Sequence, residues 1–287
     1  SAQNADSLLC IYLMPKPRPW CNLTGLGPQR DRFLRESLRG LKEQLQTLGQ
    51  DLMVLEGSPE LVLPNIVDRF SIDRVTTSYT PGWYETQAIA FLEQKLPATL
   101  SVFRGSTLFD AEQFPFEMED LPDTFSPFRR KVEKMNISSP MATPSTLPPP
   151  PSAQFDDIPR AAASPHPGLP LPGGSAAGLR RLDQFLFHTH AIVDYKQTRN
   201  ALDGLSGSST LSPWLATGAL SVRTVAHAIF RYERQHVAND STYWLYFELL
   251  WREFFHWRGV IDSQALFRQG GRSGRRLLTT FEPRHFA

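Results

Sequence analysis

Hydrophobic runs and amphipathic stretches alternate through the first hundred residues. Short apolar or β-branched runs predict strands at 8–14, 52–55, 74–79 and 100–103. Between them, apolar residues at helical spacing predict helices at 28–48, 59–70 and 84–96, with Ser58 as the N-cap and Pro59 as the first residue of the second helix. This alternation is typical of a doubly wound parallel sheet, so we predict a Rossmann-like α/β region whose first strand precedes the sequence.

The last third of the chain has a different pattern. Residues 179–192, 221–235 and 241–257 show long helical periodicity, and no strand signal separates them. We therefore expect an all-α region there, and we expect it to be incomplete.

Proline separates the two regions. Of the 24 prolines, 11 lie between Pro140 and Pro172. Such a segment lacks backbone donors and an apolar period, which favours an extended linker over the alternative of a polyproline ligand for an SH3-like partner. The expected organisation is an α/β domain over 1–136, a linker over 137–175 and a helical domain over 176–287.

Charge is distributed unevenly, although the chain as a whole is nearly neutral at +1. Residues 1–173 carry 16 basic and 20 acidic residues, whereas residues 174–287 carry 14 and 9, together with four of the six tryptophans. A basic, aromatic-rich region suits an anionic partner with flat rings, although arginine is also common on helix surfaces.

The sequence lacks the signals that mark several classes of protein. No apolar run approaches the roughly 18 residues of a membrane helix, and no signal peptide is evident, so we expect an intracellular protein that does not associate with membranes. Cys10 and Cys21 do not make a disulfide framework, and the histidines show no metal-binding spacing. The glycine-rich nucleotide motifs and the serine-hydrolase elbow are also missing.

Two segments carry candidate chemistry. Ser208, Ser209 and Thr210 precede Ser212-Pro213, which is a helix-start signal, and hydroxyl and backbone donors at such a turn can hold a phosphate. A solvated turn with an N-cap is the more common explanation of this pattern.

The second segment is the helix over 241–257. Trp244, Glu248, Trp251 and Phe255 fall on one face, and a carboxylate among aromatic rings needs a partner. Glu248 therefore either pairs with Arg252 in the core or lines a ligand pocket. For Tyr195, the sequence does not decide between a position at the edge of the core and a contact with a ligand.

These segments together resemble the photolyase/cryptochrome family. SSTLSPWLATGALSVRTV and RYERQHVANDSTYWLYFELLWREFF are similar to its cofactor domain, and VANDSTYW, FELLWREFF, DYKQTRNALDG and FSPFRRKVEK resemble the DASH cryptochromes in particular. The resemblance spans nearly the whole chain. It implies an α/β antenna domain, a connector and a helical domain that binds FAD.

The resemblance also implies residue roles. Tyr195, Arg252 and the turn formed by Ser208, Ser209, Thr210, Leu211 and Ser212 would bind FAD, while Glu248 and Trp251 would meet a cyclobutane pyrimidine dimer. The implied activity is blue-light-driven dimer repair, with damaged or single-stranded DNA as the partner. A photoreceptor that binds FAD and nucleic acid without repair is the alternative, and a chain that folds only in its α/β part is a third.

The sequence departs from the family at several positions. The family's first strand and the Asn and Asp residues that meet the flavin ring are not within it, so we expect a chain truncated at both ends that is itself inactive. Thr210 stands where the subgroup often has a basic residue. TPGWYETQ is poor in acidic residues, which makes binding of a methenyltetrahydrofolate antenna through Glu85 doubtful.

Overall fold

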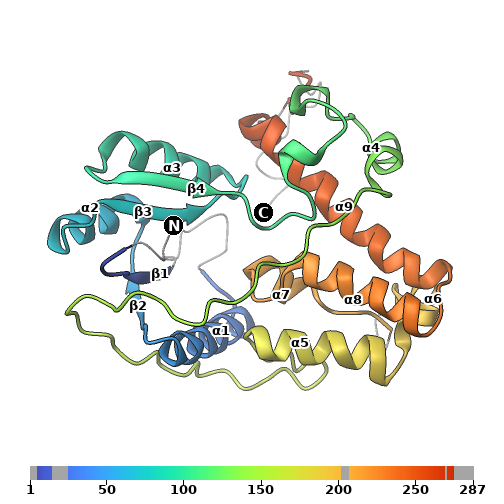
Figure 1. Ribbon diagram of the computed structural model, residues 1–287, viewed down its shortest axis with the longest axis horizontal. Coiled ribbons are helices and arrows are strands. Elements are labelled where there is room, and N and C mark those ends of the chain that lie inside the picture. The colour runs from blue at the N-terminus through green and yellow to red at the C-terminus, as the bar shows by residue number, and fades with distance from the viewer. Residues whose placement is uncertain (1–4, 15–24, 202–206, 269, 275–287) are drawn as a thin grey trace, which may run out of the picture. The chain divides into compact units, whose positions relative to one another are not determined.

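Figure 1 shows a computed structural model of the chain, which describes residues 5–14, 25–201, 207–268 and 270–274. The residues divide into two compact units. The first unit comprises 1–73 and 136–249, and the second comprises 74–135 and 250–287. The domain boundaries expected from the sequence stay a prediction.

The first unit contains a parallel strand pair of the kind that the sequence predicts. Strand β1 (Cys10–Met14) pairs with β2 (Leu52–Glu56), with Cys10 opposite Leu52. Helix α1 (Pro28–Thr47) connects them and buries Phe33 and Leu38, and α2 (Pro59–Arg69) follows β2. Prolines begin both helices, as expected where a missing N–H costs no hydrogen bond. Ser58 is the N-cap residue of α2, but its side chain makes no capping hydrogen bond.

After residue 174, the described part of the first unit consists of helices and the turns that join them. It comprises α5 (Ser175–Asp183), a π-helical turn (Gln184–His188), a 3₁₀ turn (Ala191–Asp194), α6 (Tyr195–Thr198), α7 (Ser212–Thr217), α8 (Val222–Gln235) and the first ten residues of α9 (Asp240–Asp262). The single helix predicted over 179–192 is interrupted. The Thr189 hydroxyl bonds the Gln184 carbonyl at 3.0 Å, and His190 adopts a left-handed φ of 52°, which ends the helical path.

The proline-rich segment 137–173, which we call the strap, contains neither helix nor strand, as the sequence predicts. It docks against α1 and β2 within the first unit (Figure 1). Its carbonyls accept hydrogen bonds from side chains: Pro148 from Gln50 at 2.8 Å and Leu171 from Arg32 at 2.8 Å. Ile158, only 8% exposed, joins Leu38 and Leu52 in the core. The strap is therefore part of the folded unit.

The second unit contains another parallel pair, β3 (Arg74–Ser78) with β4 (Thr99–Phe103), and helix α3 (Trp83–Lys95) lies between them in sequence. Two short 3₁₀ turns (Ala111–Gln113, Met118–Asp120), helix α4 (Phe125–Val132), the remainder of α9 and a last 3₁₀ turn (Ser263–Phe267) complete it. Helix α4, which buries Phe125, Phe128 and Val132, was not predicted from the sequence. Parallel strand pairs together with helices confirm the predicted combination of α/β and helical parts.

Candidate functional site

The hydroxyl-rich turn at residues 208–212 is held from one side by a single arginine. From α5, Arg181 donates Nε to the Ser209 carbonyl and to Thr210 Oγ1, both at 3.0 Å, and a terminal nitrogen to the Ser208 carbonyl at 2.7 Å. Burial lowers the pKa of Arg181. Thr210 adopts a left-handed φ of 54°, a costly conformation for a β-branched residue, and these contacts hold it there.

Fixing the carbonyls also fixes the direction of the amide groups. In a trans peptide the C=O of one residue points opposite to the N–H of the next. The N–H groups of Ser209 and Thr210 therefore point away from Arg181, and they have no acceptor among the described residues. The hydroxyls of Ser208 and Ser212 likewise have no partner within the described part of the chain. The turn thus has two N–H groups directed away from Arg181 and two further hydroxyl donors without a described partner.

Tyr195 lies within electrostatic reach of this turn and of α9. Its ring is 7% exposed and packs edge-on against Phe185 with centroids 5.9 Å apart. Burial raises the pKa of Tyr195, and the Glu248 charge raises it further, while the hydrogen bond with Ser209 and the Arg199 charge oppose the shift. The first unit therefore brings together three of the predicted site residues: Tyr195, Ser209 and Glu248.

Glu248 is held by two donors on one oxygen. Arg199, just after α6, donates to Oε1 at 2.8 Å, and Trp244 Nε1 donates to the same oxygen at 3.1 Å. Its Oε2 has no partner among the described residues. The side chain is 32% exposed, so a ligand can reach part of it.

The indole of Trp244 contacts two cations. Lys196 Nζ is 4.9 Å from the ring centroid and the Arg199 guanidinium carbon is 5.3 Å from it. Lys196 also pairs with Asp240 at 3.0 Å. The basic and aromatic groups expected of this region thus meet around Glu248, and cation–π contacts keep the indole in place.

The ion pair between Glu248 and Arg252 that the sequence left open is not formed. Arg252 belongs to the second unit and donates to the Ser106 carbonyl at 2.6 Å. Burial is the main cause that lowers its pKa. Its contact with FAD stays a prediction.

Trp251 also lies in the second unit, where one face of its ring is covered. Phe125 stacks on it with centroids 3.7 Å apart and an interplanar angle of 13°. The predicted role as a stacking wall for pyrimidines stays a prediction.

A second glutamate of the same motif, Glu253, is fully buried in the second unit. Its carboxylate accepts hydrogen bonds from the backbone N–H groups of Leu108 and Phe109, at 2.8 and 3.2 Å, and from Trp257 Nε1 at 2.7 Å. Burial raises the pKa of Glu253 to about 7. This carboxylate fastens the segment after β4 to α9, so its role is structural.

Three basic residues of this region, Arg181, Arg199 and Lys196, were not predicted from the sequence. Arg199 and Lys196 lie in the DYKQTRN motif that already pointed to Tyr195, so their proximity to it was available as a signal. Arg181 bonds to carbonyls 27 and 28 residues further along the chain, and no sequence pattern reports such contacts.

The residues present fit the diphosphate group of FAD. Its oxygens are acceptors, and the turn offers two backbone N–H groups that point away from Arg181. It also offers the hydroxyls of Ser208 and Ser212, which have no partner among the described residues. Within the described residues, no group of three or more His, Cys, Asp or Glu is placed to hold a metal ion. The Glu85 carboxylate folds back over Gly82, the N-cap residue of α3, and its predicted link to a folate antenna is untested.

Comparisons with known proteins show the family to which the chain belongs. A family model described as DNA photolyase matches residues 1–151. The crystal structure of the Synechocystis cryptochrome superposes with a TM-score of 0.87 at 32% identity, covering 98% of this chain and 61% of that one. A class III photolyase from Agrobacterium tumefaciens, 21% identical, shows the same fold with a TM-score of 0.71 over 90% of this chain and 54% of its own. The chain belongs to the photolyase/cryptochrome family.

Within that family its similarity is to the DASH type. The cryptochrome DASH of Idiomarina loihiensis is 34% identical over all of this chain and 65% of its own length. That of Synechocystis is 37% identical over 85% of this chain and 53% of its own. The chain thus spans between about half and two thirds of the length of these relatives.

Among the helices of the described residues, none has the length and apolar character that a membrane span requires.

Proposed function

We propose that the protein binds FAD and uses blue light to repair cyclobutane pyrimidine dimers, with single-stranded DNA as its preferred substrate. The observation that carries the proposal is the turn at 208–212, in which Arg181 holds the carbonyls of Ser208 and Ser209, so that the N–H groups that follow them point to the other side. Bound reduced FAD would supply the light-driven electron that splits the dimer.

The turn would bind the diphosphate of the cofactor. Hydrogen bonds from N–H and O–H groups to phosphate oxygens are charge-assisted and stronger than those between neutral groups. Because Arg181 fixes the carbonyls, the donors would be oriented before the cofactor arrives, which lowers the entropic cost of binding. Tyr195, buried beside Ser209, would complete this part of the site, and Arg252 would contact the flavin as the family resemblance implies.

Glu248 would orient the extruded pyrimidines. Its Oε2 is an unused acceptor, and the N–H groups of pyrimidine bases are donors. Arg199 and Trp244 hold Oε1, so the carboxylate does not need to reorganise when a base arrives. A damaged or single-stranded base leaves the stack at low cost, which favours single-stranded substrate.

The test is light-dependent loss of dimers from a UV-treated single-stranded oligonucleotide, using the protein expressed from its complete reading frame. Glu248→Gln keeps an acceptor for Trp244 and removes the negative charge. A hydrogen bond to a charged group is worth about 1.5–3 kcal/mol, so we expect the repair rate to fall roughly 10- to 100-fold with the bound flavin unchanged.

Glu43→Gln is the matched control, because Glu43 is an exposed acidic residue on α1 in the same unit. It should repair like the wild type. Loss of flavin in Glu248→Gln would contradict the substrate role, and repair at the wild-type rate in that variant would do so as well.

One observation favours the second function, a photoreceptor without repair. Phe125 already occupies a face of the Trp251 ring, which reduces the surface left for a pyrimidine to stack on. If this function holds, the wild-type protein carries flavin and responds to light, but dimers persist in the oligonucleotide at any exposure.

A further inference from the structure

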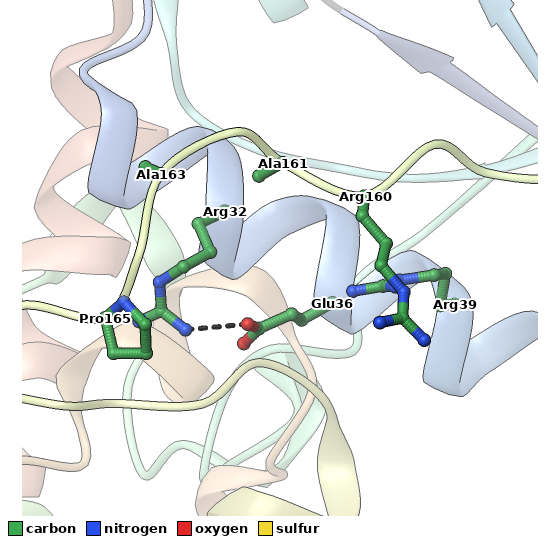
Figure 2. Close-up of a pocket in the computed structure, with 7 residues that line it drawn as sticks. All are labelled: Arg32, Glu36, Arg39, Arg160, Ala161, Ala163 and Pro165. Carbon is green, nitrogen blue, oxygen red and sulfur yellow. Dashed lines mark hydrogen bonds and ion pairs between the residues drawn. The ribbon is translucent and has the colours of Figure 1, made fainter.

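A pocket of about 330 Å³ lies between α1 and the strap, and no residue of the turn at 208–212 lines it. Arg32, Glu36 and Arg39 line it from α1, and Arg160 lines it from the strap (Figure 2). Ala161, Ala163 and Pro165 form a small apolar wall on the strap side. Three arginines and one glutamate give the pocket a formal charge of +2.

Two of these charged side chains are already used within the fold. Arg32 pairs with Glu36 Oε1 at 2.7 Å and donates to Gln29 Oε1 and to the Leu171 carbonyl. The other oxygen of Glu36 accepts from the Gly173 N–H at 2.7 Å. This pair therefore fastens the strap to α1, and the opposite charges of its two residues neutralise each other.

The remaining charge belongs to Arg39 and Arg160. Neither forms an ion pair or a hydrogen bond with another described residue, and the Nε of Arg39 is buried without a partner there. Figure 2 shows both side chains extending into the pocket, with the only dashed line joining Arg32 and Glu36. Two cations at one pocket repel each other, and a buried donor without an acceptor costs about 1–3 kcal/mol, so an anion that bridges them would relieve both penalties.

We propose that this pocket binds the phosphate group of a small phosphomonoester. A guanidinium matches phosphate in bidentate fashion, and two of them match the two negative charges that a monoester carries above its second pKa of about 6. The volume lies at the lower end of ligand pockets, about 300–1,000 Å³, and exceeds what a bare ion fills. The alanine and proline wall would accommodate the organic part of the molecule.

A phosphodiester, as in a nucleic-acid backbone, carries one negative charge per phosphate and suits the pair less well. The phosphomonoester and the backbone diester therefore make different predictions. A monoester should bind more tightly than a diester, and its affinity should fall below about pH 6 as the second proton returns.

The experiment is calorimetric titration of the FAD-loaded protein with adenosine 5′-monophosphate, inorganic phosphate and thymidylyl-thymidine, the last being a diester. We expect one site per chain for the monophosphate, weaker binding of inorganic phosphate and at least tenfold weaker binding of the diester. In Arg39→Gln/Arg160→Gln the monophosphate affinity should fall at least tenfold. Arg39→Lys should retain part of it.

Arg180→Gln is the matched control, because Arg180 is exposed on α5 in the same unit and does not line the pocket. It should bind the monophosphate like the wild type. The unfolding midpoint of each variant shows whether it is folded, and neither Arg39 nor Arg160 has a described bond to lose. Absence of monophosphate binding, equal binding by the double variant, or tighter binding of the diester would overturn the proposal.

Discussion

Glu253 and His256 lie one turn apart on α9, and burial shifts their pKa values in opposite directions. Burial raises the pKa of Glu253 to about 7. Burial, helped by the charges of Arg252 and Arg104, lowers the pKa of His256 to about 4. Both shifts favour the neutral form, as expected for ionisable groups that lose contact with water.

The two shifts have opposite effects on the pH dependence of stability. The folded protein keeps the Glu253 proton up to about pH 7, whereas the unfolded chain releases it near 4.5, so this residue lowers the free energy of unfolding as pH rises between those values. His256 takes up a proton near pH 6.5 when unfolded and near 4 when folded, so it raises the free energy of unfolding as pH rises between 4 and 6.5. They offset each other between about pH 4.5 and 6.5.

Replacing one of these two residues should reveal the effect of the other on the pH dependence of stability. In Glu253→Gln the free energy of unfolding, from urea titrations at several pH values, should rise with pH between 4 and 6.5 more steeply than in the wild type. In His256→Gln it should instead fall between pH 4.5 and 7, with a slope of up to about 1.4 kcal/mol per pH unit from Glu253. Parallel profiles for all three proteins would show that neither burial shift operates.

Whether a contact could be predicted from the sequence depends on how far apart its two residues lie along the chain. The sequence motifs singled out Tyr195, Glu248 and the turn as candidates, because these residues lie in segments of recognisable composition. The partner of Glu248 was not predictable: Arg199 is 49 residues away, whereas Arg252 is one helical turn along. Local spacing favoured Arg252, and tertiary packing brought Arg199 to the carboxylate.

At the scale of elements, the docking of the strap depends on a close approach at Gly173. A Cβ on this residue would lie 2.2 Å from the Phe33 carbonyl oxygen and 2.7 Å from the Ser37 nitrogen, both backbone atoms that do not move without shifting α1. The Gly173 N–H also bonds Glu36 at 2.7 Å. The requirement for glycine here is steric.

Gly173→Ala should therefore loosen the strap. We expect the free energy of unfolding to fall by about 2–3 kcal/mol, the cost of forcing an extra methyl group into packed structure. Gly105→Ala is the control, because nothing lies within 4 Å of its Cβ position, and it should stay within about 0.5 kcal/mol of the wild type. A urea midpoint of Gly173→Ala equal to that of the control would show that the contact is not tight.

Periodicity predicted the strands of both parallel pairs and helices α1 to α3 to within a few residues, because their apolar faces repeat regularly. It identified the strap as extended but not as docked. The bonds that hold it, such as Arg32 to Leu171 across 139 residues, join side chains to carbonyls and leave no pattern. Helix α4 was missed although Phe125, Phe128 and Val132 have helical spacing, since the surrounding turns obscured a short element.

The net charge of the whole molecule is close to zero, but its basic and acidic residues are distributed unevenly along the chain. The excess of basic residues after residue 173 accompanies the groups around Tyr195 and Glu248, where we place FAD and DNA. The pocket with Arg39 and Arg160 adds a second place for an anion within the more acidic part of the sequence. Salt should weaken binding at both, because each depends on charge.

The proposed function requires that the turn at 208–212, held by Arg181, binds FAD. The direct measurement is the number of FAD molecules per chain, and their dissociation constant, in the protein from the complete reading frame. We predict about one FAD per wild-type chain, and at least tenfold weaker retention in Ser208→Ala/Ser212→Ala and in Arg181→Gln, with unfolding midpoints showing that each variant is folded. A wild-type protein without flavin, or folded variants that retain it unchanged, would contradict the account.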